Sequence, residues 1–383
     1  MHTIGILLPR STYYGGIGFE MFEGLRAGLK RAGRDDIRIV AENIGFGTDK
    51  QECYRLAERL IIQENVSVVF AYLGHRTAQL SRPLFMAANR LLVVLDAGAH
   101  LPQEWPSSPN IFYHSLNNSL GIWLNAHAAI RDGYRQAGVT SCFYDGGYLQ
   151  MVAAANGFVS GGGEIVYNHI TGYTPEDFVL SPLKKYTESF SEACLLPVFS
   201  GEYAEWFFRD LVNEKLNIKQ TIYPAPFTLE ESVLGRSKFP KNHIKGIVAW
   251  SMNLSNTENL IFCDSIREAG REATLFSLLG WEAAILAIEG CRLMQVNNNN
   301  GALSSKGLSS FVFESPRGKI SYHEKWNHSL CGMHEVVIEE DENGFSKLRP
   351  VGEIENCDSA FEALVAVPLE KAVSGWFNSY TCI

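Results

Sequence analysis

The sequence has no apolar run long enough to cross a membrane and no run of basic residues. Its longest apolar stretch, Leu91 to Ala99, is interrupted by Asp96 and is shorter than the roughly 18 uncharged residues that a membrane span needs. The 33 basic residues are outnumbered by 42 acidic ones, which gives a net charge of -9. Chains that follow a phosphate backbone use clusters of Lys and Arg. We therefore expect no membrane-spanning segment and no nucleic-acid partner.

Cysteine is sparse, and the printed N-terminus lacks an export signal. The eight cysteines are spread from Cys53 to Cys382, without the density of a small disulfide-stabilised fold. Met1 leads directly into the apolar segment IGILLP, with no basic stretch or cleavage site before it. These features predict reduced thiols, and they predict a cytoplasmic protein if Met1 is the native start. A leader removed upstream of Met1 would instead make the protein periplasmic.

Motifs of common enzyme classes are also missing. The sequence contains no G-x-S-x-G turn, no G-x-x-x-x-G-K-[ST] phosphate loop, no H-E-x-x-H and no G-x-G-x-x-G after a strand. One group of residues has a spacing that could supply a zinc ion, namely His323, His328, Cys331 and His334. Alternation along a strand would point some of these side chains to opposite faces. We expect no catalytic residue, no metal site and no cofactor.

What the sequence does contain is an alternation of apolar strands and amphipathic helices. It is 46% hydrophobic and 20% charged, as in ordinary globular proteins, and its length favours two domains. In the first unit we predict strands at 4–8, 37–41, 66–72 and 91–97. We predict three helices: one at 19–32, one that begins after a capping box formed by Thr48 and Gln51, and one from residue 74 to near residue 89. Continuous Val-rich strands indicate a parallel sheet that is covered by helices on both faces.

The same alternation restarts near residue 117. We predict helices at 122–137, 149–158, 203–216, 257–269 and 276–294, and strands at 139–145, 193–200, 220–226 and 246–251. The later segments FVFES, GKISYH, HEVVIEE and FSKLRPV alternate in polarity, which is typical of antiparallel strands. The chain is thus predicted to contain two α/β units and a late antiparallel segment.

The loops that follow the predicted strands are rich in residues suited to ligand binding. In parallel α/β sheets, ligands bind outside the carboxyl ends of the strands. Tyrosines in such loops can cover an apolar ligand while their hydroxyl groups make hydrogen bonds. The loop residues that we single out are Tyr14, His75, Arg76, Thr77, Ala97, Gly98 and Ala99 in the first unit, and Tyr148, Tyr203 and Phe227 in the second. Two such sheet edges facing each other would form a cleft.

Five segments resemble the type I periplasmic binding proteins, in particular the Leu/Ile/Val-binding and amide- or urea-binding receptors. GILLPRSTYYGGIGFEMFEGLRAGL is similar to the first strand, ligand loop and long helix of that family, and LLVVLDAGAH is similar to its fourth strand and ligand-contacting loop. YDGGYLQM and PVFSGEY resemble the aromatic ligand loops of the second lobe, and FESPRGKISYHEKWNHS resembles the late strand hairpin. The resemblance covers nearly the whole chain.

This resemblance implies two Rossmann-like α/β lobes that are joined by three hinge crossings and close around a ligand. It implies crossings near residues 115–119, 250–253 and 326–331. Lobe 1 would then comprise residues 1–116 and 251–328. Lobe 2 would comprise residues 117–250 and 329–383.

The resemblance also implies a role for individual loop residues. The family's contacts to the polar head of the ligand correspond here to His75, Arg76, Thr77, Ala97, Gly98 and Ala99. The sequence departs from the amino-acid receptors at two points, because His75 and Arg76 replace a loop rich in serine and threonine, and Ala99 replaces an expected threonine. Arg76 is predicted to hold a carboxylate through paired, charge-assisted hydrogen bonds. An ammonium group would have to meet Glu202, Glu230 or Glu231.

These features predict a binding protein rather than an enzyme. The first interpretation is the substrate-binding component of an ABC-type transporter, which closes on a branched-chain amino acid, an amide, urea or a small carboxylate and is recognised by membrane subunits. The second interpretation is a cytoplasmic ligand sensor of the same fold that controls a regulatory protein. An α/β enzyme that uses the same cleft is the third.

Overall fold

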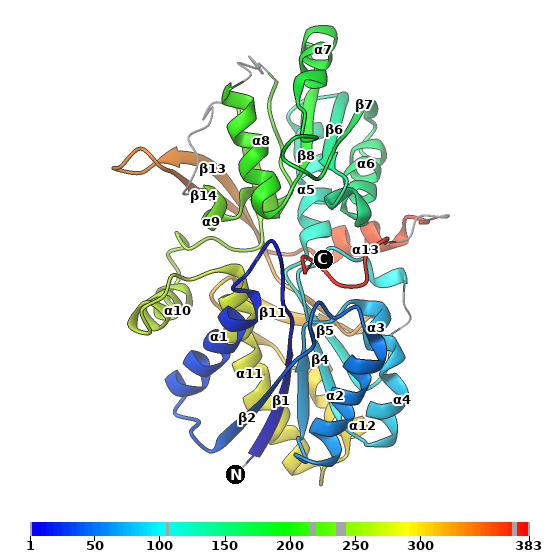
Figure 1. Cartoon of the computed structure of the whole chain (residues 1–383), viewed down its shortest axis with the longest axis vertical. Coiled ribbons are helices and arrows are strands. Elements are labelled where there is room, and N and C mark those ends of the chain that lie inside the picture. The colour runs from blue at the N-terminus through cyan, green and yellow to red at the C-terminus, as the bar shows by residue number, and fades with distance from the viewer. Residues whose placement is uncertain (1, 105–106, 214–219, 235–242, 370–373, 382–383) are drawn as a thin grey trace.

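The computed structural model describes residues 2–104, 107–213, 220–234, 243–369 and 374–381. Two lobes are stacked along the long axis of the molecule (Figure 1). We call lobe 1 the one that contains strand β1 (His2–Leu8), and lobe 2 the one that contains strand β6 (Gln136–Cys142). Each lobe has its own β-sheet.

Within the described residues, the sheet of lobe 1 has eight strands in the order β10-β11-β12-β5-β4-β3-β1-β2. Strands β1 to β5 run parallel to their neighbours, β12 pairs in parallel with β5, and β10 and β11 are antiparallel. Besides β1, the strands are β2 (Ile37–Asn43), β3 (Val68–Ala71), β4 (Leu91–Asp96), β5 (Ile111–Ser115), β10 (Phe313–Ser315), β11 (Gly318–His323) and β12 (His328–Leu330).

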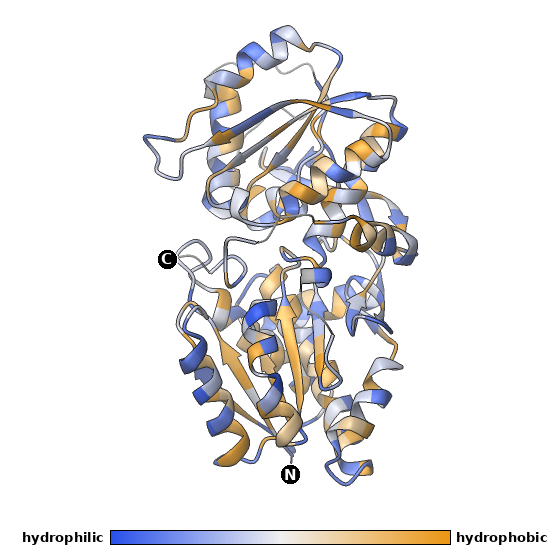
Figure 2. Ribbon diagram, turned by 90° about the vertical axis from the view of Figure 1, so that its right-hand side faces the viewer, coloured by the Kyte–Doolittle hydropathy of each residue, from blue (hydrophilic) through white to orange (hydrophobic). Residues whose placement is uncertain are grey.

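Helices cover both faces of this sheet, because alternate strand residues point to opposite sides. Val68 and Phe70 pack in one apolar cluster with α1 and α11, whereas Val69 and Ala71 pack in another with α2 and α4. Figure 2 shows the apolar strands inside and the polar residues on the outer helix faces. The helices of lobe 1 are α1 (Ile17–Arg31), α2 (Lys50–Ile62), α3 (His75–Leu80), α4 (Arg82–Ala87), η1 (Pro102–Glu104), α10 (Thr257–Glu268), α11 (Leu275–Val296) and α12 (Gly301–Ser309).

Lobe 2 contains two three-stranded groups, β7-β6-β8 and β14-β13-β9. Ile222 forms parallel bridges to Leu195 of β8 and to Ile244 beside β9, so the two groups continue one another. The strands are β7 (Glu164–Thr171), β8 (Cys194–Val198), β9 (Lys245–Val248), β13 (Met333–Glu340) and β14 (Ser346–Ile354). The helices are α5 (Asn118–Arg131), η2 (Asp145–Gly147), α6 (Gln150–Ser160), α7 (Ser181–Ser189), α8 (Gly201–Asn213), η3 (Pro226–Leu229), α9 (Glu231–Leu234) and α13 (Asp358–Ala366).

The chain passes between the two sheets after β5, after β9 and between β12 and β13. Only Cys331 and Gly332 separate β12 from β13. The boundary that we placed between residues 328 and 329 falls inside β12, which pairs with the sheet of lobe 1. The predicted α/β architecture with two Rossmann-like lobes is confirmed.

Several local predictions were wrong for identifiable reasons. The cap of α2 is Asp49, whose carboxylate accepts the backbone N–H groups of Gln51 and Glu52, rather than Thr48. The single helix predicted from residue 74 to 89 is divided into α3 and α4 by Pro83, which has no N–H to donate. The helix predicted at 122–137 begins at Asn118 and ends at Arg131, and Gly133 follows with a φ of 98°. Residues 214–216 of another predicted helix lie outside the described residues.

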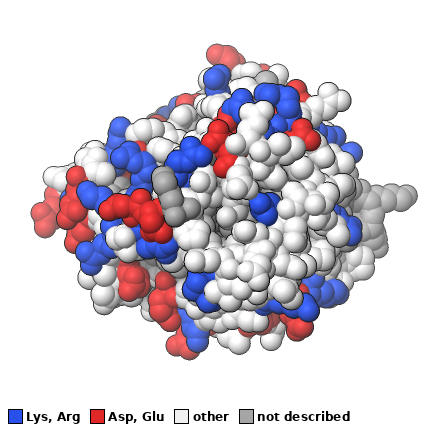
Figure 3. Space-filling view, turned by 90° about the horizontal axis from the view of Figure 1, so that it is seen from below, with Lys and Arg blue, Asp and Glu red and all other residues white. Residues whose placement is uncertain are grey.

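The surface of lobe 1 carries charges of both signs. Figure 3 looks at its lower end, where Lys and Arg side chains are intermixed with Asp and Glu. Of the helices in the described ranges, none is both long and apolar enough to span a membrane.

Candidate ligand-binding site

The two lobes touch through the loops that follow their parallel strands. The hydroxyl oxygen of Tyr14, in the loop after β1, accepts the backbone N–H of Gly201 in lobe 2 at 2.8 Å. The neighbouring Tyr13 lies 2.6 Å, hydroxyl to hydroxyl, from Tyr203 on α8. Ser11 holds this loop in place, because its Oγ accepts the N–H groups of Tyr13 and Tyr14 at 3.1 and 2.9 Å. The lobes therefore meet at the carboxyl edges of both sheets, where ligands bind in parallel α/β folds.

Lobe 2 contributes further aromatic side chains at this point. Tyr148 follows η2, and its hydroxyl lies 2.6 Å from that of Tyr144. Phe227, on η3, lies 6.3 Å from Tyr14 and from Phe276 of lobe 1, measured between ring centroids. The rings of Tyr14 and Phe276 are 5.0 Å apart in an edge-to-face arrangement. The side chains of Tyr144, Tyr148, Phe227 and Phe276 are nearly inaccessible to solvent. Burial of the Tyr14 hydroxyl raises its pKa well above the ordinary value.

The same space is occupied by the C-terminal segment 374–381, which runs between the lobes in Figure 1. Tyr380 stacks on Phe227 with ring centroids 4.3 Å apart and planes 4° from parallel. Its hydroxyl oxygen accepts hydrogen bonds from the side-chain amides of Asn118 and, at 2.8 Å, Gln150. Its backbone N–H donates to the Tyr148 hydroxyl at 2.7 Å. None of its residues was predicted as a site residue, although three aromatic residues lie within five positions, at 376, 377 and 380.

Asn118 and Gln150 were also missed. Both lie on helices, in the first turns of α5 and α6, whereas the prediction considered only the loops that follow strands. Asn118 donates to the Gln150 side-chain oxygen at 2.9 Å, so the two amides form one buried network. Buried side-chain amides of this kind need partners. Their polar side chains in largely apolar helices were the available signal.

The three predicted residues after β3 differ in their exposure to solvent. His75 is buried, and its Nε2 lies 3.2 Å from Oδ2 of Asp96 at the end of β4. Burial would raise the pKa of Asp96, but the bond and charge of His75 lower it to about 2. Arg76 is exposed, and its guanidinium lies 5.1 Å from the ring centroid of Phe377 in the C-terminal segment. Thr77 is buried, with no partner for its hydroxyl among the described residues. The ligand roles of these three residues stay predictions.

Of the three predicted residues after β4, Ala97 and Gly98 form hydrogen bonds with the first hinge crossing, and Ala99 is buried. The carbonyl of Gly98 accepts the backbone N–H and the hydroxyl of Ser119, both at 2.8 Å, and the carbonyl of Ala97 accepts the N–H of Asn118 at 3.3 Å. Gly98 has a φ of 82°, and a Cβ there would lie 2.4 Å from the backbone nitrogen of Asn118. This loop therefore fixes the start of α5 against lobe 1.

Asp145 joins the two ligand loops of lobe 2 to each other. Its carboxylate accepts the N–H and the hydroxyl of Ser200 at 2.9 and 2.8 Å, and the thiol of Cys142 at 3.3 Å. Burial raises the pKa of Asp145 to about 7, although these hydrogen bonds act in the opposite direction. Ser200 directly precedes Gly201, whose N–H donates to Tyr14, so Asp145 holds the residue next to the interlobe contact.

An open hollow of about 580 Å³ continues outward from the aromatic rings. Tyr13, Tyr14 and Phe276 line its inner part. Its described lining also includes the guanidinium of Arg271 and the carboxylates of Glu20, Glu23, Glu202, Glu205, Glu230 and Glu272, from both lobes. The mouth of the site is therefore predominantly acidic.

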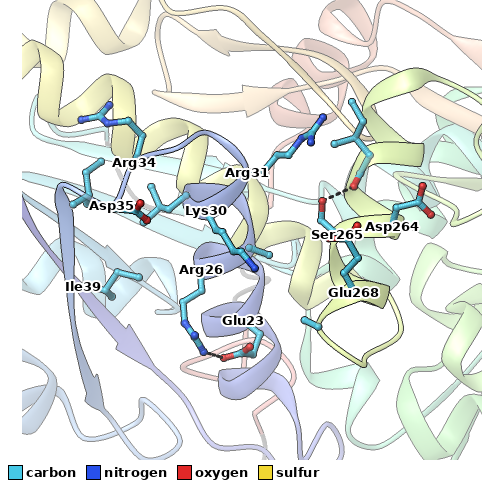
Figure 4. A pocket seen from close by; sticks show the side chains of 15 residues that line it. Glu23, Arg26, Lys30, Arg31, Arg34, Asp35, Ile39, Asp264, Ser265 and Glu268 are labelled. Atoms are coloured by element: carbon cyan, nitrogen blue, oxygen red, sulfur yellow. Dashed lines mark hydrogen bonds and ion pairs between the residues drawn. The ribbon is translucent and has the colours of Figure 1, made fainter.

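A larger hollow of about 760 Å³ lies on the surface of lobe 1, between α1, β2 and α10. Figure 4 shows that charged side chains surround it, among them Arg26, which pairs with Glu23 at 2.8 Å, and Lys30. It lies away from the carboxyl ends of the strands and takes no residue from lobe 2. We therefore place the ligand site between the lobes rather than in this larger hollow.

Three of the residues with zinc-like spacing form hydrogen bonds to other groups of the protein. His328 lies 2.6 Å from the side-chain oxygen of Asn117, and His334 and Cys331 both donate to the carbonyl oxygen of Arg317, at 3.0 and 3.3 Å. Within the described ranges, no group of three His, Cys, Asp or Glu side chains is arranged to hold a metal ion.

Comparison with solved structures identifies the fold. The chain is similar to an ABC transporter substrate-binding protein from Sphaerobacter thermophilus, with 20% identity, a TM-score of 0.79 and coverage of 92% of this chain and 98% of the other. It is similar to a solute-binding protein of a Rhodopseudomonas palustris ABC transporter, solved with 4-hydroxybenzoate, with 15% identity, a TM-score of 0.75 and coverage of 93% and 97%. A third is a branched-chain amino acid ABC transporter ligand-binding protein from Burkholderia xenovorans LB400, with 14% identity, a TM-score of 0.74 and coverage of 94% and 97%.

The sequence itself supports the same assignment. No protein of curated function matches it. Residues 2–341, which include most of both lobes, match the family described as periplasmic binding protein. The resemblance found in the sequence is thereby confirmed, together with the prediction of a solute-binding protein. The chain belongs to the periplasmic binding protein family.

Proposed function

We propose that this protein binds a small molecule with an aromatic ring between its lobes and presents it to the membrane subunits of an ABC transporter. The observation that carries the proposal is the meeting of Tyr14 and Phe276 from lobe 1 with Phe227 from lobe 2. Aromatic rings at centroid distances of about 4.5 to 7 Å attract one another in stacked or edge-to-face geometry. A flat ring is therefore the ligand shape that this site receives best.

Two further observations support an aromatic ligand. The amides of Asn118 and Gln150 both donate toward one point beside Phe227, so an oxygen substituent on the ring would find hydrogen bonds there. The similar protein from Rhodopseudomonas palustris was solved with a hydroxylated benzoate. The glutamates at the mouth act against an anionic ligand by like-charge repulsion and favour a neutral or cationic one.

Thermal unfolding with a set of probes tests this proposal, since a ligand that binds only the folded state stabilises it by RT ln(1 + [L]/Kd). We expect tyramine to raise the Tm more than the anions 4-hydroxybenzoate and benzoate, which the glutamates at the mouth repel, and leucine and urea to leave it unchanged. At about 100 times Kd the stabilisation is about 2.7 kcal/mol. The proposal fails if only leucine or urea raises the Tm.

A pair of variants localises the binding. Phe227→Ala removes the ring beside the proposed site and should abolish the ligand-induced rise in Tm relative to the ligand-free variant. Phe345→Ala, a matched change at an exposed residue of the β13–β14 hairpin, should retain the rise. Equal rises in both variants would place the ligand elsewhere.

The predicted role of Arg76 is tested with an anionic probe. If Arg76 holds the carboxylate of benzoate, Arg76→Ala should weaken binding by about 2 to 5 kcal/mol, the range for leaving one member of a buried charged pair unmatched. Arg76→Lys should restore affinity only partly, because an ammonium group cannot make the paired contact. Unchanged affinity by calorimetry would assign Arg76 to the surface.

A ligand sensor that controls a regulatory protein is the second candidate function. The seven cysteines of the described residues are free thiols, and six of them are buried. Free thiols persist in reducing compartments. Fractionation of cells that express the protein distinguishes the two: a mature protein in the periplasm supports transport, and one in the cytoplasm supports sensing.

A further inference from the structure

The C-terminal segment 374–381 contacts both lobes through hydrogen bonds. On the side of lobe 2, the Trp376 indole N–H donates to the carbonyl of Tyr144 at 2.6 Å. On the side of lobe 1, the Asn378 side-chain amide donates to the carbonyl of Tyr72 at 3.1 Å, and Ser11 donates to the carbonyl of Tyr380 at 2.7 Å. A segment of eight residues thus bridges the ligand loops of both lobes, as a bound ligand would.

The end of the segment is buried as completely as the core. Tyr380 is 0% exposed, and Asn378, Ser379 and Thr381 are 2 to 4% exposed. Each polar group of the Tyr380 backbone is paired, the N–H with Tyr148 and the carbonyl with Ser11. Residues of both lobes therefore satisfy the backbone of Tyr380.

The Tyr380 side chain occupies the position that the proposed function assigns to the ligand. Its ring lies flat on Phe227 and edge-on to Tyr14, at centroid distances of 4.3 and 6.1 Å. Its hydroxyl oxygen receives the two amide donors of Asn118 and Gln150. The backbone of Tyr380 has a φ of 54°, in the left-handed region that is unfavourable for a residue other than glycine. Strain of this kind persists only where surrounding contacts impose it.

Three loop glycines make room for the segment. A Cβ on Gly74 would lie 1.6 Å from the carbonyl oxygen of Phe377, and a Cβ on Gly147 would lie 1.9 Å from Nε1 of Trp376. On Gly47, a Cβ would lie 2.4 Å from the side-chain nitrogen of Asn378. These glycines come from both lobes, so the cleft makes room for residues 376–378 from both sides.

We propose that segment 374–381 is an internal ligand, which holds the lobes together by placing Tyr380 in a phenol-binding subsite made by Phe227, Asn118 and Gln150. The inference rests on the proposed function in one respect, that an external aromatic ligand uses the same subsite. Such a ligand must displace Tyr380 before it binds. Its apparent Kd is then the intrinsic Kd divided by the fraction of molecules in which the segment is released.

Tethering makes this competition effective. A segment that is joined to its own binding site acts at an effective concentration that is set by the tether and does not depend on the protein concentration. A segment peptide with modest affinity would therefore fill the cleft of its own chain while binding weakly to others in trans. Release of the segment would couple ligand binding to exposure of the C-terminal residues.

The first experiment uses the full chain and a synthetic peptide with the sequence of residues 374–381. In the double variant Trp376→Ala, Tyr380→Ala the internal ligand is weakened but the cleft is unchanged. The labelled peptide should bind this variant at least tenfold more tightly than the wild type, as measured by fluorescence anisotropy. A folded double variant that binds the peptide no better than the wild type would overturn the proposal.

Adjacent glycines supply the matched control for the cleft. Gly147→Ala places a methyl group against Trp376, whereas Gly146→Ala has only Ile170, at 3.9 Å, within reach of the new Cβ. In the double-variant background, Gly147→Ala should abolish peptide binding and Gly146→Ala should retain it. Equal peptide affinity in both would show that the peptide binds elsewhere and would overturn the proposal.

A second measurement needs no change to the segment. Chymotrypsin cleaves after aromatic residues, so Trp376, Phe377 and Tyr380 report whether the segment is docked, with cleavage followed by mass spectrometry. The segment should resist cleavage in the wild type and in Gly146→Ala, and should be cleaved at least tenfold faster in Gly147→Ala. Equally rapid cleavage in all three proteins would overturn the proposal.

Small-molecule probes separate this inference from the proposed function. Tyramine and 4-hydroxybenzoate should bind the double variant at least tenfold more tightly than the wild type and should displace the peptide. If the peptide binds but neither probe displaces it, the internal ligand stands and the proposed aromatic ligand is wrong. If a probe displaces the peptide but binds wild type and double variant equally, Tyr380 does not occupy the subsite in the wild type and the internal ligand is wrong.

Discussion

Protonation of Asp145 is expected to control the stability of the folded protein between pH 5 and pH 8. Asp145 is completely buried beside the contact between the lobes, where it accepts hydrogen bonds from Ser200 and Cys142. Burial raises its folded-state pKa to about 7, whereas an aspartate in the unfolded chain has a pKa of about 3.9. Between these values the folded state binds more protons than the unfolded state. The free energy of unfolding therefore falls as the pH rises through this window.

The size of the effect follows from the two pKa values. Protonation of the folded state contributes about 2.6 kcal/mol of stability at pH 5 and almost nothing at pH 8, so about 2.5 kcal/mol is lost between them. Asp145→Asn removes the titration but retains an acceptor oxygen for the Ser200 N–H. Its amide can donate to the Ser200 hydroxyl, which rotates to accept. The variant should therefore be less sensitive to pH than the wild type by about 2.5 kcal/mol.

Urea unfolding of both proteins at pH 5 and pH 8 measures this difference. Circular dichroism and tryptophan fluorescence should give coincident transitions, so that the free energy of unfolding can be calculated with a two-state model. The difference between the two free energies of unfolding should change by about 2.5 kcal/mol in favour of the Asp145→Asn variant as the pH rises. A difference that stays constant to within about 0.5 kcal/mol would refute the assigned pKa and its cause.

Two further predictions concern the framework of the site. Glu282 on α11 is completely buried and forms hydrogen bonds with both Arg317 and His114. Glu282→Gln should therefore lower the free energy of unfolding by about 3 to 5 kcal/mol. The control Glu289→Gln, which alters a surface pair with Arg292 on the same helix, should lower it by less than about 1 kcal/mol. Gly98→Ala should destabilise the protein by more than Gly270→Ala in the same urea assay, because both positions have positive φ but only at Gly98 does the new Cβ meet backbone atoms. A Glu282→Gln cost below about 1 kcal/mol, or equal costs for the two glycine changes, would contradict these expectations.

The sequence determined the α/β alternation and the location of the ligand loops. Strands β3 and β4 are short apolar runs that are buried along their whole length, and such runs are typical of a sheet that is covered on both sides. Since parallel strands share a carboxyl edge, their loops had to meet. Tyr14, Tyr148 and Phe227 could therefore be singled out, although their partners could not.

Local sequence patterns predicted individual residues less well where several neighbouring residues could fill the same role. Thr48 and Asp49 are both acceptable helix caps, and the choice of Asp49 depends on which of them the preceding loop places over the first turn. Asn118 and Gln150 carry no loop signature, because they act from the first turns of helices. Nothing in their neighbourhood in the sequence indicates the pairing.

Only the tertiary structure decided where the late strands and the C-terminal segment lie. Strands β10 to β12 join the sheet of lobe 1, whereas β13 and β14 join that of lobe 2, and alternation of polarity specifies a face but no partner. The contacts of Tyr380 with Asn118, Gln150 and Phe227 span between 153 and 262 positions along the chain, as follows from their residue numbers. The cleft exists only when two separately folded lobes face each other. Its occupation by the chain's own end is for that reason a property of the assembled molecule, which local sequence patterns do not encode.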